Sequence, residues 1–186
     1  MLDAEVAQFD AAVRGGAVCH EAVRNFLALN GPSILNEKLP GSSLSLLDDY
    51  MVDSMFDDDL SPLANLLSAG MDPNLQRPGF GGGHTLLMSA AYSNEPRLVE
   101  LLLRHGADPN VADDRGWTPL MFAVALDETL AASATTSAAV VRLLVDGGGD
   151  VGARNAKGHS ADDILALQTL ADPEDVAIVA RALHPA

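Results

Sequence analysis

Apolar residues in this chain recur at helical spacing in short runs, and turn residues follow each run. The first run ends at Gly15 and places four apolar residues on one helix face: Val6, Phe9, Ala12 and Val13. Similar patterns predict helices over residues 18–29, 44–56, 60–68, 85–93, 96–105, 118–126, 138–146, 160–167 and 173–183. Short helices arranged in pairs predict a row of stacked helical hairpins in place of one globular core.

A repeated segment joins these pairs. Residues 106–120, GADPNVADDRGWTPL, lie between two predicted helices, and weaker copies occur at residues 70–88 and 148–161. On these residues the chain resembles the ankyrin repeat family, whose helix-start motif is Thr-Pro-Leu-His-x-Ala at a period of about 33 residues. The resemblance implies an all-α ankyrin-repeat solenoid of about five helix-turn-helix units with short hairpin fingers.

The predicted organisation is a single ankyrin-repeat domain over residues 1–186. Terminal units are expected to be atypical, because one side of each faces water. The five predicted parts are a divergent N-terminal helical cap at 1–32, a degenerate repeat at 43–74, a repeat at 75–110, a repeat with an inter-helix insertion at 111–152, and a C-terminal capping repeat at 153–186.

Aligning the helix starts locates two insertions. The finger from Asn74 to Thr85 spans 11 positions, whereas the finger from Asn110 to Thr118 spans 8, so the first is longer by 3. The step from the first to the second helix of a pair is 13 positions from residue 85 to 98 but 22 from 118 to 140, an excess of 9. We assign that excess to a loop over Asp127–Ser137. Such loops often mark a binding face, but they can also be neutral slack.

Several residues fit structural roles in the repeats. Thr118 is expected to bond backbone groups at a helix start. Gly106 and Gly148 are expected to end helices at positive φ. Methionine replaces the motif histidine at Met88 and Met121, so the backbone-bonding role of that histidine is expected to be lost.

The chain carries 11 basic and 26 acidic residues, a net charge of −15. This charge disfavours nucleic acid and anionic membranes and favours fast encounter with a basic partner. No apolar run approaches the length of a membrane span, and the first residues lack a secretion-signal pattern. With a single cysteine, these features predict a soluble cytoplasmic protein that is a monomer on its own.

An acidic run is the sharpest charged feature. On a helix, residues 49, 53 and 57 would share one face, and like charges at that spacing repel. The run is interpreted as a solvated outer face, as a docking site for a basic partner, or as a metal site, although it lacks the glycine turn of common calcium loops. Its members are Asp48, Asp49, Asp53, Asp57, Asp58 and Asp59.

A partner-binding surface is predicted from the alignment. His84, Trp117 and His159 follow the turn glycine in successive repeats, so stacking would align them near the finger tips. The alternative is that Trp117 only covers the neighbouring repeat, although tryptophan is a common interface anchor. The full predicted set combines this ladder with finger and inner-helix residues: Phe80, His84, Tyr92, Asp114, Arg115, Trp117, Leu126 and His159.

Catalytic patterns are weak. Cys19 and His20 are adjacent, which on a helix points them apart and disfavours a dyad. The histidines lack zinc-site spacing, and the glycine run at residues 79–83 has no lysine and no preceding strand. Ser160, followed by two aspartates, is expected to cap a helix. We therefore expect no enzyme activity, no cofactor and no metal.

The sequence predicts a protein–protein interaction module that binds its partner through the concave face and the finger loops. The alternative is an acidic inhibitor or immunity-type protein that masks a basic enzyme such as a nuclease, since the net charge and the acidic run suit a basic target. The fold alone cannot name a partner.

Overall fold

The computed structural model describes residues 2–14, 28, 29, 31, 47, 50, 59–76, 82–125, 134–168 and 172–185. These residues form helices and connecting turns without a strand, so the predicted all-α class is confirmed. None of the helices in this described part is long and apolar enough to cross a membrane. The chain divides into two compact units, Met1–Asp72 and Pro73–Ala186.

The first unit pairs two described helices, α1 (Leu2–Arg14) and α4 (Ser61–Ser68), which pack against each other. The apolar face of α1 is buried at Val6, Phe9 and Val13, as the spacing predicted. The Asn65 side chain donates a 2.7 Å hydrogen bond from Nδ2 to the carbonyl of Val13. A buried polar contact thus fixes one helix against the end of the other.

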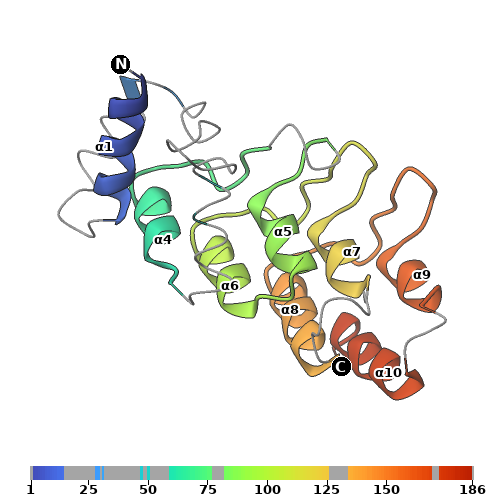
Figure 1. The fold of residues 1–186 in the computed structure, drawn as a ribbon. Coiled ribbons are helices and arrows are strands. Elements are labelled where there is room, and N and C mark those ends of the chain that lie inside the picture. The colour runs from blue at the N-terminus through green and yellow to red at the C-terminus, as the bar shows by residue number, and fades with distance from the viewer. Residues whose placement is uncertain are drawn as a thin grey trace. The chain divides into compact units, whose positions relative to one another are not determined.

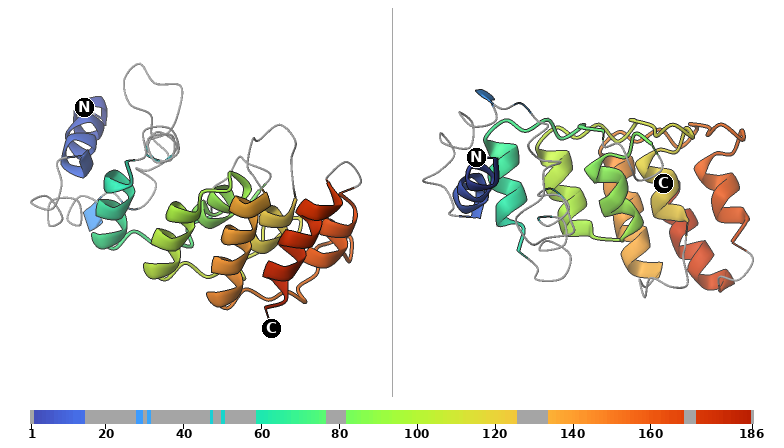
Figure 2. Two further views of the ribbon diagram at one scale, coloured as in Figure 1. Left: turned by 90° about the horizontal axis from the view of Figure 1, so that it is seen from below. Right: turned by 45° about the horizontal axis from the view of Figure 1, so that its top comes forward.

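The second unit contains three described helical hairpins, which pack in two rows (Figures 1 and 2). The first row is α5 against α7 against α9, the second is α6 against α8 against α10, and each hairpin also packs its own two helices together. The bounds are α5 (Leu86–Tyr92), α6 (Pro96–Arg104), α7 (Pro119–Val124), α8 (Ala134–Asp146), α9 (Ala161–Ala166) and α10 (Pro173–Leu183).

Aliphatic side chains fill the space between the rows. Each helix buries residues that are three or four positions apart in sequence and therefore lie on one face. This face packs against the neighbouring helices. On the second row, the helices α6, α8 and α10, the buried residues include Leu98, Leu102, Val140, Leu144, Val179 and Leu183.

The helix ends confirm some of the predicted roles and contradict others. Gly106 and Gly148 have φ of 88° and 93°, so both helices end as expected. The Thr85 hydroxyl accepts the Met88 amide at 3.3 Å, and the Thr85 amide donates to the Met88 sulfur at 3.4 Å. The expected loss of the motif-histidine role is therefore wrong in this repeat, because the thioether is also an acceptor. The capping prediction for Thr118 is wrong too: it lies at the N-cap of α7 without a side-chain cap bond.

The predicted loop over Asp127–Ser137 is wrong at its end. Helix α8 begins at Ala134, so the last four residues of the assigned insertion are helical. Ala134 and Ser137 are buried, because the added turn packs toward the stack. Part of the insertion thus lengthens α8, the second helix of this hairpin. Residues 126–133 lie outside the described residues.

Asparagine side chains bridge successive repeats. Asn74 Oδ1 accepts the amide of Asp108 at 2.7 Å, and Asn110 Oδ1 accepts the amide of Asp150 at 2.7 Å. Each asparagine also donates from Nδ2 to the helix-ending glycine two residues before that aspartate, at 3.4 and 3.0 Å. The same two-bond bridge in both places holds the turns in register, and it positions the fingers that follow them.

Candidate functional site

One buried carboxylate organises the finger before α7. Asp113 Oδ1 accepts the backbone amides of Arg115 at 2.9 Å and Trp117 at 2.8 Å. Its Oδ2 accepts Nε and Nη2 of Arg115 at 3.0 and 2.9 Å. The side chain of Asp113 is 0% exposed, whereas that of Arg115 is 54% exposed. The finger therefore folds around an ion pair whose negative end is inside and whose positive end faces out.

The guanidinium of Arg115 also lies over two aromatic rings. Its central carbon is 5.6 Å from the ring centre of Trp117 and 5.8 Å from that of Phe122. A cation at this distance is attracted by the negative face of a ring. Arg115 is thus held from two sides, by Asp113 and by the rings.

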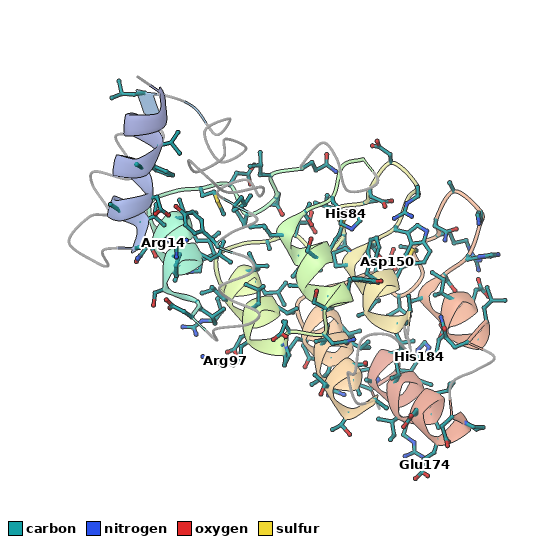
Figure 3. All side chains as sticks on the ribbon, in the orientation of Figure 1. Arg14, His84, Arg97, Asp150, Glu174 and His184 are labelled. Atoms are coloured by element: carbon teal, nitrogen blue, oxygen red, sulfur yellow. The ribbon has the colours of Figure 1, made fainter. Side chains whose placement is uncertain are left out.

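Phe122, on α7, is the centre of an aromatic cluster that we define as His84, Tyr92, Trp117 and Phe122. Ring centres lie 4.7 Å away for His84, 5.1 Å for Trp117 and 6.3 Å for Tyr92. Phe122 and His84 are buried, whereas Trp117 is half-buried and Tyr92 is 40% exposed. His84 lies where the connecting loop enters α5 (Figure 3). The cluster therefore has a buried base, formed by His84 and Phe122, and an accessible rim, formed by Trp117 and Tyr92.

Backbone contacts join the fingers to one another. The amide of Asp114 donates to the carbonyl of Gly82 at 3.1 Å, and the amide of Ala156 donates to the carbonyl of Arg115 at 2.9 Å. His84 Nδ1 also lies 4.0 Å from Asp113 Oδ2, across the junction of two repeats. The rim of the cluster consequently sits on a support that spans three successive repeats.

Comparison with known proteins identifies the family. A family model described as ankyrin repeats, in three copies, matches residues 51–155. This match covers more than half of the 186 residues. The chain belongs to the ankyrin repeat family.

Individual relatives agree with this assignment. The ankyrin repeat and SAM domain-containing protein 6 of Rattus norvegicus is 34% identical over 113 residues, 60% of this chain and 12% of that protein. The 2-5A-dependent ribonuclease of Homo sapiens is 33% identical over 84 residues, 45% of this chain and 11% of that protein. The tRNA endonuclease ANKZF1 of Bos taurus is 42% identical over 66 residues, 36% and 9% of the two chains. The chain spans about a tenth of the length of these relatives.

The predicted site residues are partly brought together in this ankyrin stack. His84, Tyr92, Arg115 and Trp117 meet around Phe122, but the burial of His84 leaves it little surface for a partner. Other predicted members lie elsewhere or outside the described residues. His159 is half-buried in the next finger, where its amide donates to Asn155 Oδ1 at 3.1 Å. Asp114 is exposed, and Phe80 and Leu126 are outside the described residues.

The acidic run is described only at its last member. The carboxylate of Asp59 accepts the amide of Ser61 at 2.9 Å, just before α4. This backbone bond, helped by the Ser61 hydroxyl, lowers the pKa of Asp59 below its usual value. Residues 48, 49, 53, 57 and 58 lie outside the described residues, so the role of the run stays a prediction. No three His, Cys, Asp or Glu side chains of the described residues are grouped as metal ligands.

Sequence reasoning missed two central residues, Asp113 and Phe122. A signal for the first was present: Asp113 and Asn155 both stand three positions before a turn glycine, and both fold their finger through side-chain bonds to backbone. Phe122 had a weaker signal, as an aromatic residue inside a helix made otherwise of small and aliphatic residues. Its central position becomes clear only when the repeats are stacked.

Proposed function

We propose that this protein binds a partner protein through the concave face and the fingers, with the rim of the aromatic cluster as the anchor. Ankyrin repeats are protein–protein interaction modules, typically without catalytic activity. The observation that carries the proposal is the juxtaposition of Arg115, Trp117 and Tyr92 around Phe122 on a hydrogen-bonded support. Tryptophan, tyrosine and arginine are the residue types that most often dominate interface energies.

Pre-ordering supports the same proposal. Freezing flexible side chains opposes association, and that loss is smaller when they are already held in place. The Arg115 side chain is fixed by Asp113, and the Trp117 ring packs beside both that guanidinium and Phe122, with centres 5.6 and 5.1 Å away. A partner that covers this rim therefore gains apolar contact with little loss of side-chain entropy, because the rim is already ordered.

A substitution at Trp117 tests the proposal. Trp117→Ala should weaken partner binding by about 2 kcal/mol or more, because it removes the largest ring of the rim. Proteins captured from the source cell by the parent chain would be compared with those captured by this variant and by Leu167→Ala. Leu167 is an exposed apolar residue after α9 and serves as the control. Equal capture by all three chains, with thermal unfolding confirming that Trp117→Ala is folded, would contradict this site.

The alternative function, masking of a basic enzyme, rests on the net charge of −15 and on the acidic run Asp48–Asp59. Most of that run lies outside the described residues, so we keep it as a prediction. The expected cytoplasmic location, monomeric state and lack of a cofactor are likewise proposals, consistent with an interaction module.

A further inference from the structure

We infer that the partner segment which covers the aromatic cluster carries a carboxylate, and that this carboxylate binds the outer edge of Arg115. The inference rests on the proposed function and adds the chemistry of the partner. It also runs against the net charge of −15, from which a basic partner would be expected.

The donors of Arg115 point to this chemistry. The guanidinium has five N–H groups, of which Nε–H and one N–H of Nη2 are used by Asp113 Oδ2. The outer edge, formed by Nη1 and the second N–H of Nη2, makes no hydrogen bond to the described residues, because both bonds to Asp113 use the other edge. This edge matches the two oxygens of a carboxylate, which it can bind through two parallel hydrogen bonds.

Desolvation makes such a group necessary. The guanidinium lies over the Trp117 ring, so a partner that covers the ring also removes water from Arg115. Burial of a cation is unfavourable unless an anion and hydrogen-bond acceptors replace the lost water. A lysine or arginine of the partner at this point would add repulsion to the same cost.

The aspartates of the finger do not meet this need. Asp113 lies beneath the guanidinium, fully buried, and its two oxygens already accept four hydrogen bonds. The carboxylate of Asp114 lies against Gly82 and Gly83 of the preceding finger. It is so close to Gly82 that a Cβ atom on that glycine would collide with it. Both negative charges are therefore turned away from the outer edge of Arg115.

A second exposed basic residue, Lys157, lies on the adjoining finger. Ala156 bonds to the carbonyl of Arg115 at 2.9 Å, and the following residue, Lys157, is exposed. Arg154, by contrast, is bound to Asp163 of α9, the helix that follows its finger, at 3.0 Å. Arg115 and Lys157 are thus two exposed basic residues on adjoining fingers that a backbone hydrogen bond joins, and an acidic partner segment suits both.

Selection from a phage-displayed library of random 12-residue peptides tests the inference. Peptides would be selected on the parent chain and kept only if their binding is lost with Trp117→Ala. Each would then be made with every Glu or Asp replaced by Gln or Asn, and its affinity measured for the parent chain and for Arg115→Met. The Met side chain keeps the apolar stem over the ring. Lys157→Met provides a second variant that leaves the Asp113 bonds intact.

We expect the selected peptides to be rich in Asp or Glu beside apolar residues. The amide replacement in the peptide should weaken its binding to the parent chain about tenfold or more. It should weaken binding to Arg115→Met much less, because that variant already lacks the contact with the carboxylate. Selection of Lys- or Arg-rich peptides, or an amide replacement without effect on the parent chain, would overturn the inference while leaving the proposed function intact. Recovery only of peptides that bind Trp117→Ala unchanged would overturn both.

Discussion

Asp113 shows how one side chain can order a surface from below. Its four hydrogen bonds join two backbone amides and the guanidinium of Arg115 into one unit, and the same guanidinium lies over Trp117 and Phe122. Because the carboxylate is buried, these bonds are stronger than the same contacts in water. Stability of the finger and order of the proposed contact surface therefore depend on the same residue.

Replacing Asp113 tests this role. Asp113→Asn keeps one acceptor for the backbone but places an amide N–H group against Arg115, so we expect a loss of about 2 kcal/mol in the free energy of unfolding. Urea unfolding measures it. The matched control is Asp114→Asn, which removes the neighbouring exposed carboxylate and should change stability by less than about 0.5 kcal/mol. Equal effects of the two variants would show that burial and the Arg115 pair do not matter.

The cap of α9 predicts a pH effect. Asp163 accepts the amide of Ser160 at 2.9 Å and its hydroxyl at 3.0 Å, and the Ser160 hydroxyl accepts the Asp163 amide at 3.2 Å. The Ser160 backbone bond first, then its hydroxyl and Arg154, lower the pKa of Asp163 from its ordinary 3.8. A lowered folded-state pKa means that the stabilisation is complete above 3.8 and is lost as the pH falls through the lower folded value.

Melting temperatures measure this effect. Asp163→Asn should melt below the parent chain at neutral pH, and the difference should shrink as the pH falls below 3.8, where the parent carboxylate takes up its proton. Glu100→Gln, at an exposed position of α6, should show a small difference that does not follow this course. A gap for Asp163→Asn that stays constant to the lowest pH would contradict the cap.

At the residue scale, contacts between near neighbours in sequence could be predicted, whereas contacts between repeats could not. Ser160 was recognised as a cap from its own neighbours, because cap bonds connect residues three apart. The difference between Asp113 and Asp114 could not be read in the same way. Both are aspartates in one turn, and the path of the finger, with positive φ at Gly116, determines which carboxylate turns inward. Phe122 gained its importance from Tyr92 and His84, which belong to another repeat.

At the scale of elements, the asparagine bridges couple each turn to the next. Asn110→Ala removes one acceptor and one donor that bind backbone groups of the following repeat, which should cost about 1 kcal/mol because water can reach this exposed site. Amide hydrogen exchange locates the effect: protection should fall at Asp150. Asn74→Ala is the matched variant, and protection should fall at Asp108 in that case. A loss of protection at the same amides in both variants would mean that the bridges act globally and not between neighbours.

Element positions were predictable where a strong signal marked the boundary. Proline or a cap residue lies at the start of α4, α6 and α10, and glycine follows α6 and α8, so those ends were found within a few residues. The start of α8 had no such signal. Its first residues are alanine, threonine and serine, which are compatible with helix or loop, and burial of Ala134 and Ser137 against the stack favours the helix.

At the scale of the whole molecule, two electrostatic effects oppose each other. The chain carries a net charge of −15, which any approaching acidic segment meets first. The Arg115 edge acts only at contact distance, since Asp113 beneath it cancels much of its field farther out. Long-range steering thus disfavours the same partner chemistry that the local geometry favours, and the two can be separated because salt screens distant charges more than close ones.

Binding kinetics should reveal this separation. For an acidic peptide that requires Arg115, the association rate constant should rise several-fold between about 0.01 M and 0.15 M salt, as the Debye length falls from about 30 Å to about 8 Å and the repulsion is screened. The dissociation rate constant should rise as well, because the carboxylate contact is weakened. Fluorescence of Trp117, the single tryptophan of the chain, can follow both rates by stopped flow. The Gln-substituted peptide is the control, with rates nearly independent of salt. An association rate that falls with salt for the acidic peptide would mean that local cations, not the net charge, govern the approach.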